Sequence, residues 1–93
     1  MSEIHITRHH GLSHKKARAA AERVAEELSD EFNLEWEWHG DVLHFHRSGV
    51  EGQLAVGRKE IEIRAKLGFL LSAFRSGIEQ EIHKFCDENF GDR

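Results

Sequence analysis

Apolar residues occupy every second position along residues 34–67, and this alternation is the clearest pattern in the chain. A period of two places the apolar side chains on one face of a β-sheet and the polar side chains on the other. Three short breaks, at Gly40-Asp41, at Ser48-Gly49 and at residues 57–60, divide the stretch into four strands. The pattern therefore predicts an antiparallel meander of four strands joined by tight turns.

Residues paired across these three turns give one consistent register. Every turn sets apolar residues opposite apolar residues, and a slip of one residue in any turn would invert the two faces. The predicted apolar pairs are Trp36 with Phe45, Trp38 with Leu43, Leu43 with Leu54, Phe45 with Gly52, Leu54 with Ile63, and Val56 with Ile61. The predicted polar pairs are Glu35 with His46, Glu37 with His44, His46 with Glu51, His44 with Gln53, Gln53 with Arg64, and Glu51 with Lys66.

The segments on either side of the meander have other periods. Residues 3–8 alternate like a short strand, which we expect to pair with residues 61–67. Residues 13–32 carry apolar side chains at three- and four-residue steps, which predicts an amphipathic helix capped by Ser13. After Ser72, a second candidate N-cap, a closing helix is predicted with a buried stripe of Phe74, Ile78, Ile82 and Phe85.

This order of elements predicts the fold class. We expect a single α+β domain over residues 1–93, with the order β-α-β-β-β-β-α. It has one mainly antiparallel five-stranded sheet with two helices packed on one face, because an antiparallel sheet with one apolar face needs only one covering layer. Trp36 and Trp38 are expected near the centre of the core.

Composition and charge exclude several classes of protein. A share of 39% hydrophobic residues is typical of a folded domain, and a net charge of −4 argues against a nucleic-acid partner. The single cysteine excludes an intrachain disulfide. The chain has neither the apolar run of a signal peptide nor one long enough for a transmembrane segment, so we expect a cytoplasmic protein.

Two polar clusters are candidate ligand sites. His44, His46, Glu35 and Glu51 share the outer sheet face and could bind a metal ion, although a lattice of cross-strand charge pairs explains the same residues. A basic group near the first helix could bind an anion at the helix N-terminus, or could simply be a solvated basic surface. Its members are Arg8, His14, Lys15, Lys16 and Arg18.

Two apolar groups are candidate contact or ligand sites. Three apolar residues in a row cannot all point into the core, so Gly68, Phe69, Leu70 and Leu71 form a candidate contact patch unless the segment bends to bury them. A cavity between sheet and closing helix could hold a small apolar ligand such as an acyl chain. Its candidate lining is Trp36, Trp38, Phe45 and Phe74.

Candidates for catalysis are weak. Ser13, Ser48 and Ser72 lie at cap or turn positions, outside any nucleophile-elbow motif. Cys86 follows His83 by three residues on the closing helix, a spacing that simple packing also produces. We therefore expect a structural Cys86, no catalytic residue and no cofactor.

Several short stretches resemble the small polyhydroxyalkanoic acid system family of bacteria. They are Ile4-His5-Ile6, Leu34-Glu35-Trp36, Gly40-Asp41, the RSGVEG turn at residues 47–52 and the KLGFLLS segment at residues 66–72. The family is linked to the synthesis or use of storage polyesters, and some members lie at the granule surface. The resemblance supplies no catalytic residues.

The resemblance implies a non-enzymatic accessory protein of the polyhydroxyalkanoate storage system, partly located at granules. Its expected partner is the granule surface or another protein of the system, and a homodimer seam would also use an apolar patch. A small-ligand module and a metal-binding protein remain the alternatives.

Overall fold

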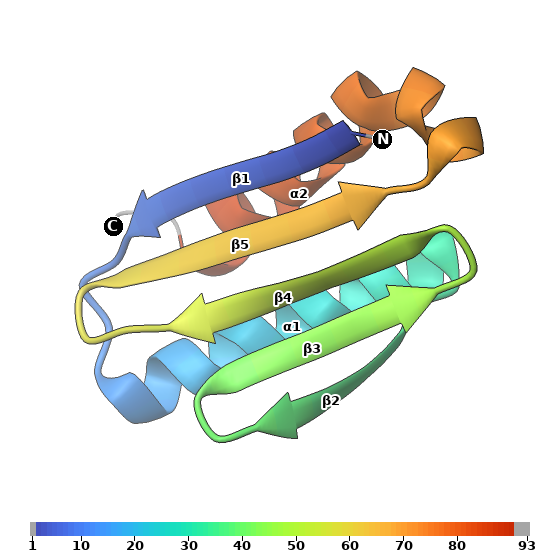
Figure 1. Cartoon of the computed structure of the whole chain (residues 1–93). Coiled ribbons are helices and arrows are strands. Elements are labelled where there is room, and N and C mark those ends of the chain that lie inside the picture. The colour runs from blue at the N-terminus through green and yellow to red at the C-terminus, as the bar shows by residue number, and fades with distance from the viewer. Residues whose placement is uncertain (1, 91–93) are drawn as a thin grey trace.

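The computed structural model describes residues 2–90, without the side chains of Ser2 and Leu70, and it confirms the predicted order of elements (Figure 1). A 3₁₀ helix, η1, precedes the closing helix. The elements are β1 (Ser2–His9), α1 (His14–Phe32), β2 (Glu35–His39), β3 (Val42–Arg47), β4 (Val50–Val56), β5 (Glu60–Leu67), η1 (Phe69–Phe74) and α2 (Arg75–Phe90).

The five strands form one antiparallel sheet in the order β1-β5-β4-β3-β2. All twelve residue pairs predicted across the three turns are present, and β1 pairs with β5 as expected, with Ile6 opposite Ile63. Two of the tight turns contain a glycine with a positive φ angle, 64° at Gly40 and 87° at Gly49, a conformation that glycine adopts readily. The alternation in the sequence thus predicts the strand register as well as the strands.

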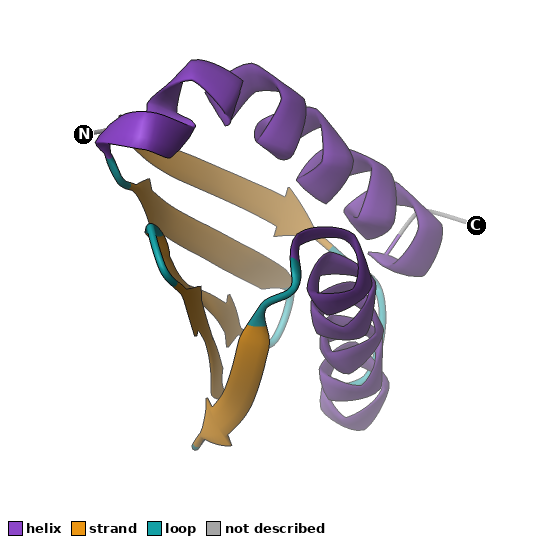
Figure 2. Cartoon of the chain, turned by 90° about the vertical axis from the view of Figure 1, so that its right-hand side faces the viewer, coloured by secondary structure: helices purple, strands orange, loops and turns teal. Residues whose placement is uncertain are grey.

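Both helices contact the same face of the sheet (Figure 2). α1 lies over β2, β3 and β4, α2 lies over β1, and the two helices touch each other. The core between the layers consists of inward-facing strand residues such as Leu43, Leu54 and Ile63, together with a stripe of small residues from α1. The opposite face of the sheet is turned toward the viewer in Figure 1, and no helix or strand of residues 2–90 covers it.

α1 has the sequence features of a helix that lies close to a sheet. Ser13 accepts a hydrogen bond from the backbone N–H of Lys16, and Asn33 ends the helix in a left-handed conformation, with φ of 60°. Four of its six buried residues are alanines, which add little bulk between helix and strands. None of the helices within residues 2–90 is long and apolar enough to cross a membrane.

The start of the closing helix differs from the prediction. Ser72 lies inside η1 instead of capping an α-helix, and α2 begins at Arg75. Phe74 is 63% exposed, so its predicted place in the buried stripe is wrong, whereas Ile82 and Phe85 are buried as expected. A 3₁₀ turn advances each residue by about 120° instead of 100°, so the periodicity of α2 does not extend back to Phe74.

The two tryptophans lie less deeply in the core than the sequence predicts. Both lie on β2, which is an edge strand, and both are only half-buried against the core. Trp38 donates a hydrogen bond from Nε1 to the carboxylate of Glu22 at 2.6 Å, and the Arg18 guanidinium lies 3.9 Å from the centre of its ring. At this edge of the sheet, the Trp38 ring therefore contacts Glu22 and Arg18 of α1 as well as the apolar core.

Candidate functional site

The segment after β5 carries the two large apolar side chains that the structure shows as exposed. Gly68 turns the chain away from the sheet, because its N–H donates to the carbonyl of Gly49 at 2.8 Å and its own carbonyl accepts from the Ser72 hydroxyl at 3.1 Å. From this fixed start, Phe69 is 84% exposed and Phe74 is 63% exposed. The result is a hydrogen-bonded segment with two phenylalanine rings in solvent.

The predicted contact patch is therefore divided. Phe69 points outward, whereas Leu71 packs half-buried against the core and lies close to Gly49. The side chain of Leu70 lies outside the described residues. Phe74, which the sequence assigned to the interior, joins Phe69 on the surface. We call Phe69 and Phe74 the exposed phenylalanines.

An apolar cavity of about 60 Å³ lies beside this segment, where α1 ends and α2 begins. Six of its lining residues are buried and form the floor, and five are partly or fully exposed and form the rim. The floor consists of Leu28, Leu34, Phe45, Ala65, Leu67 and Ile82, and the rim consists of Phe32, Arg47, Val50, Leu71 and Ile78. We call this space the wedge cavity.

The wedge cavity is not the cavity that the sequence suggested. Of the four residues named there, only Phe45 lines it. Trp36 and Trp38 lie on the edge strand, and Phe74 is in solvent. Sequence reasoning missed Arg47 at the rim, although the alternation on β3 does place residue 47 on the same face as Leu43 and Phe45.

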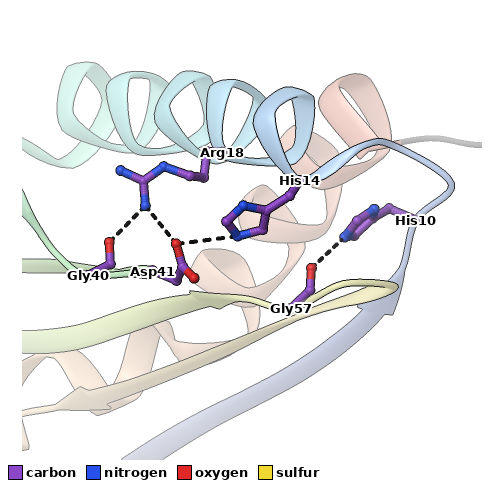
Figure 3. A network of polar contacts seen from close by, with 6 residues as sticks. All are labelled: His10, His14, Arg18, Gly40, Asp41 and Gly57. Carbon is purple, nitrogen blue, oxygen red and sulfur yellow. Dashed lines mark hydrogen bonds and ion pairs between the residues drawn. The ribbon is translucent and has the colours of Figure 1, made fainter.

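The basic group predicted as an anion site is split between two parts of the molecule. Figure 3 shows His14 and Arg18 of α1 directed at Asp41 in the turn between β2 and β3. Arg18 donates to the Gly40 carbonyl at 2.7 Å and to Asp41 at 3.0 Å, and His14 lies 3.3 Å from the same carboxylate. These contacts join the helix to the turn, and the Asp41 carboxylate already pairs with the Arg18 guanidinium.

Arg8 is engaged elsewhere. It lies on the helix-facing side of β1 and makes contacts with Asp87 and His83 of α2. Lys15 and Lys16 are exposed at the start of α1. The five residues therefore do not converge on one point, and three of them, Arg8, His14 and Arg18, help to hold the helices on the sheet.

The candidate metal ligands lie in two neighbouring rows on the uncovered face. Glu35, His46 and Glu51 are cross-strand neighbours, and His44 lies in the adjacent row. Within residues 2–90, no group of three or more His, Cys, Asp or Glu side chains is arranged to hold a metal ion. The flat row of pairs fits a charged lattice.

Two carboxylates on this face have shifted acidities. The hydrogen bond from His39, at 2.9 Å, lowers the pKa of Glu37 below its ordinary value. The hydrogen bond from His5, at 2.6 Å, together with the nearby Arg64, lowers the pKa of Glu62. Imidazole–carboxylate pairs are thus the main polar interactions of the uncovered face.

Cys86 and His10 are buried on the helix-facing side. Burial raises the pKa of the Cys86 thiol to about 11, so the sulfur stays protonated at neutral pH. His10 is 7% exposed and accepts a hydrogen bond at Nδ1 from the N–H of Leu12, while its Nε2 lies 3.3 Å from the Gly57 carbonyl (Figure 3). This arrangement assigns the ring proton to Nε2.

Comparison with protein-family models gives one match. Residues 4–90 match the family described as "Putative polyhydroxyalkanoic acid system protein", which confirms the resemblance found in the sequence. The matched residues include the whole wedge cavity and both exposed phenylalanines. Neither the curated proteins nor the solved structures give a match.

Proposed function

The chain belongs to the family of polyhydroxyalkanoic acid system proteins, and from this premise we propose that it is a non-enzymatic accessory protein that attaches to polyhydroxyalkanoate granules. The attachment is made by the exposed phenylalanines. The observation that carries the proposal is the position of Phe69 and Phe74, which are the large apolar residues exposed to solvent among the side chains that the structure describes. Exposed apolar groups are a feature of contact surfaces.

The size of this surface supports reversible attachment. Burial of one phenylalanine side chain contributes about 1.5–3 kcal/mol, so the two rings together contribute roughly 3–6 kcal/mol before the costs of association. Because association itself costs about 4 kcal/mol or more, contact through two rings is weak and is lost on dilution. Permanent anchoring would need a larger apolar surface.

The chemistry of the remaining polar groups supports a role without catalysis. Ser13 caps α1, and the Ser72 hydroxyl donates to a backbone carbonyl. Cys86 is buried, and its raised thiol pKa leaves no thiolate to act as a nucleophile. Ser13 and Ser72 thus have structural tasks, and Cys86 is kept in its unreactive thiol form.

Co-sedimentation with polyester granules tests the proposal. We expect the wild-type protein to pellet with granules and the double variant Phe69→Asp/Phe74→Asp to stay in the supernatant, because two carboxylates oppose contact with an apolar surface. Gln53→Glu, on the opposite face of the sheet, is the control for added negative charge and should pellet like the wild type. Thermal melting of each variant establishes that it is folded.

Granules washed free of protein separate two types of partner. Binding to washed granules supports direct attachment to the polyester surface. Binding to native granules alone would point to a protein partner and would overturn direct attachment. Equal pelleting of the wild type and the folded double variant would exclude the exposed phenylalanines as the contact.

A further inference from the structure

The wedge cavity has the architecture of a small ligand site. Its floor is formed by buried side chains from α1, α2, β3, β5 and the connection between α1 and β2, whereas its rim residues are accessible from solvent. Well-packed protein interiors contain few voids larger than a water molecule. An apolar cavity with an accessible rim is therefore a feature that needs an explanation.

Arg47 gives the cavity a charged rim. One Nη1–H donates to the carbonyl of Phe32 at 2.8 Å, which leaves the other guanidinium N–H groups available. The ion pairs found within residues 2–90 do not include Arg47. A cation without a carboxylate partner, at the mouth of an apolar cavity, is complementary to an amphiphile with an anionic head.

The volume limits the tail of such a ligand. One water-sized group needs about 10–15 Å³ of cavity volume, so a cavity of about 60 Å³ holds roughly four to six such groups. A methylene group is similar in size to a water molecule. The cavity therefore fits an unbranched tail of about four to six carbons, and longer tails would need the helices to move apart.

We propose that the wedge cavity binds a short-chain carboxylate, with its alkyl tail among the floor residues and its carboxylate on Arg47. The planar guanidinium suits a carboxylate because it can donate two parallel N–H groups. This inference does not depend on granule attachment, because the exposed phenylalanines do not line the cavity.

A purely structural role for Arg47 is the alternative. α1 has no basic residue of its own in its last turn, and Arg47 donates to the carbonyl of Phe32 at that end. A cation there would stabilise the helix even in an empty cavity. The experiment must therefore distinguish ligand binding from helix capping.

Titration with hexanoate, followed by two-dimensional ¹H–¹⁵N NMR, tests the proposal on the wild-type chain. We expect saturable shifts at Arg47, Val50 and Leu71. Acetate carries the same charge without a tail and should bind at least about tenfold more weakly, because each buried methylene contributes about 0.8 kcal/mol. Hexanamide has the same tail without the charge.

Two variants separate the tail from the head group. Ala65→Val fills the floor and should abolish the shifts with both hexanoate and hexanamide, whereas Ala55→Val makes the same change on the uncovered face of the sheet and should leave them intact. Arg47→Gln keeps an N–H donor for Phe32 but removes the charge. It should weaken hexanoate by about tenfold or more and leave hexanamide nearly unchanged.

Three results would overturn the proposal. The first is the absence of saturable shifts with hexanoate on the wild-type protein, a measurement that depends on no variant. The second is equal binding of hexanoate by Ala65→Val and the wild type. The third is an Arg47→Gln protein that melts at a lower temperature but binds hexanoate with unchanged affinity, which would make Arg47 a helix cap only.

Discussion

The two faces of the sheet are built by the same strands and the same register, but they differ in what covers them. The inner face is packed under α1 and α2, with residues such as Ile61 and Ile63 completely buried. The outer face has no covering layer and carries rows of glutamate, histidine, lysine and arginine. Apolar burial on the inner face supplies most of the driving force for folding, so the outer face can vary in sequence at small cost.

Polar residues on the covered inner face need hydrogen-bond or ion-pair partners within the protein. Arg8 and His10 lie at the end of β1 on the covered side, and each has a partner: Asp87 for Arg8, and Leu12 and Gly57 for His10. Buried polar groups without partners would cost about 1–3 kcal/mol each. Among the described residues, no buried side-chain nitrogen or oxygen lacks a hydrogen-bond partner.

Truncation of neighbouring residues on β5 gives the largest contrast between the faces. Ile63→Ala should lower the free energy of unfolding by roughly 2–5 kcal/mol, because it removes buried apolar atoms and leaves a cavity. Arg64→Ala, one position along on the outer face, should change it by no more than about 0.5 kcal/mol. Urea denaturation at neutral pH measures both free energies of unfolding. Similar losses would show that the outer face contributes to the stability of the protein as strongly as the inner face.

Two glycines give a second contrast, between the packed inner face of the sheet and the exposed surface of α2. A Cβ atom at Gly52 would lie 2.6 Å from both the Arg64 carbonyl and the Phe45 ring, so Gly52→Ala should destabilise the protein by about 1–3 kcal/mol. No heavy atom lies within 4 Å of a Cβ at Gly77 in α2, so Gly77→Ala should stabilise it by about 0.5–1 kcal/mol. Thermal melting compares the two, and a stabilising Gly52→Ala would show that Phe45 does not cover the glycine as described.

The smallest effect is a pH dependence on the outer face. The pKa of Glu62 is lowered in the folded protein, chiefly by its hydrogen bond with His5, so its contribution to stability is complete above its ordinary value of 4.5 and is lost as the pH falls through the lower folded value. Glu62→Gln should therefore melt below the wild type at pH 6, and the gap should close toward pH 3. A gap that stays constant over this range would contradict the contribution of the charged pair.

The strand register was predictable because two signals agree at every turn. Alternation places Trp36, Leu43 and Leu54 on one face, and the turn residues allow only one alignment that keeps them there. The depth of burial was not predictable in the same way. Trp36 has the pattern of a core residue, but its strand lies at the sheet edge, and an alternating pattern does not distinguish edge strands from central ones.

The candidate sites were less predictable because they depend on tertiary contacts. Phe74 fits the spacing of Ile78 and Ile82, and only the 3₁₀ geometry of η1 turns it outward. Arg47 ends a strand pattern like any solvated arginine, and its place at the cavity rim depends on where α1 ends. Charge clusters in sequence, such as Lys15 and Lys16 beside Arg18, did not reveal that Asp41 reaches across from the meander.

The pairing of β1 with β5 sets an order of events during synthesis. β1 is made well before its partner β5, since His5 and Glu62 are 57 positions apart. At roughly 5–20 residues per second, β1 waits several seconds as an unpaired strand. Its exposed apolar side is then Ile4 and Ile6 alone, and so short a strand limits the risk that newly made chains join through their edges.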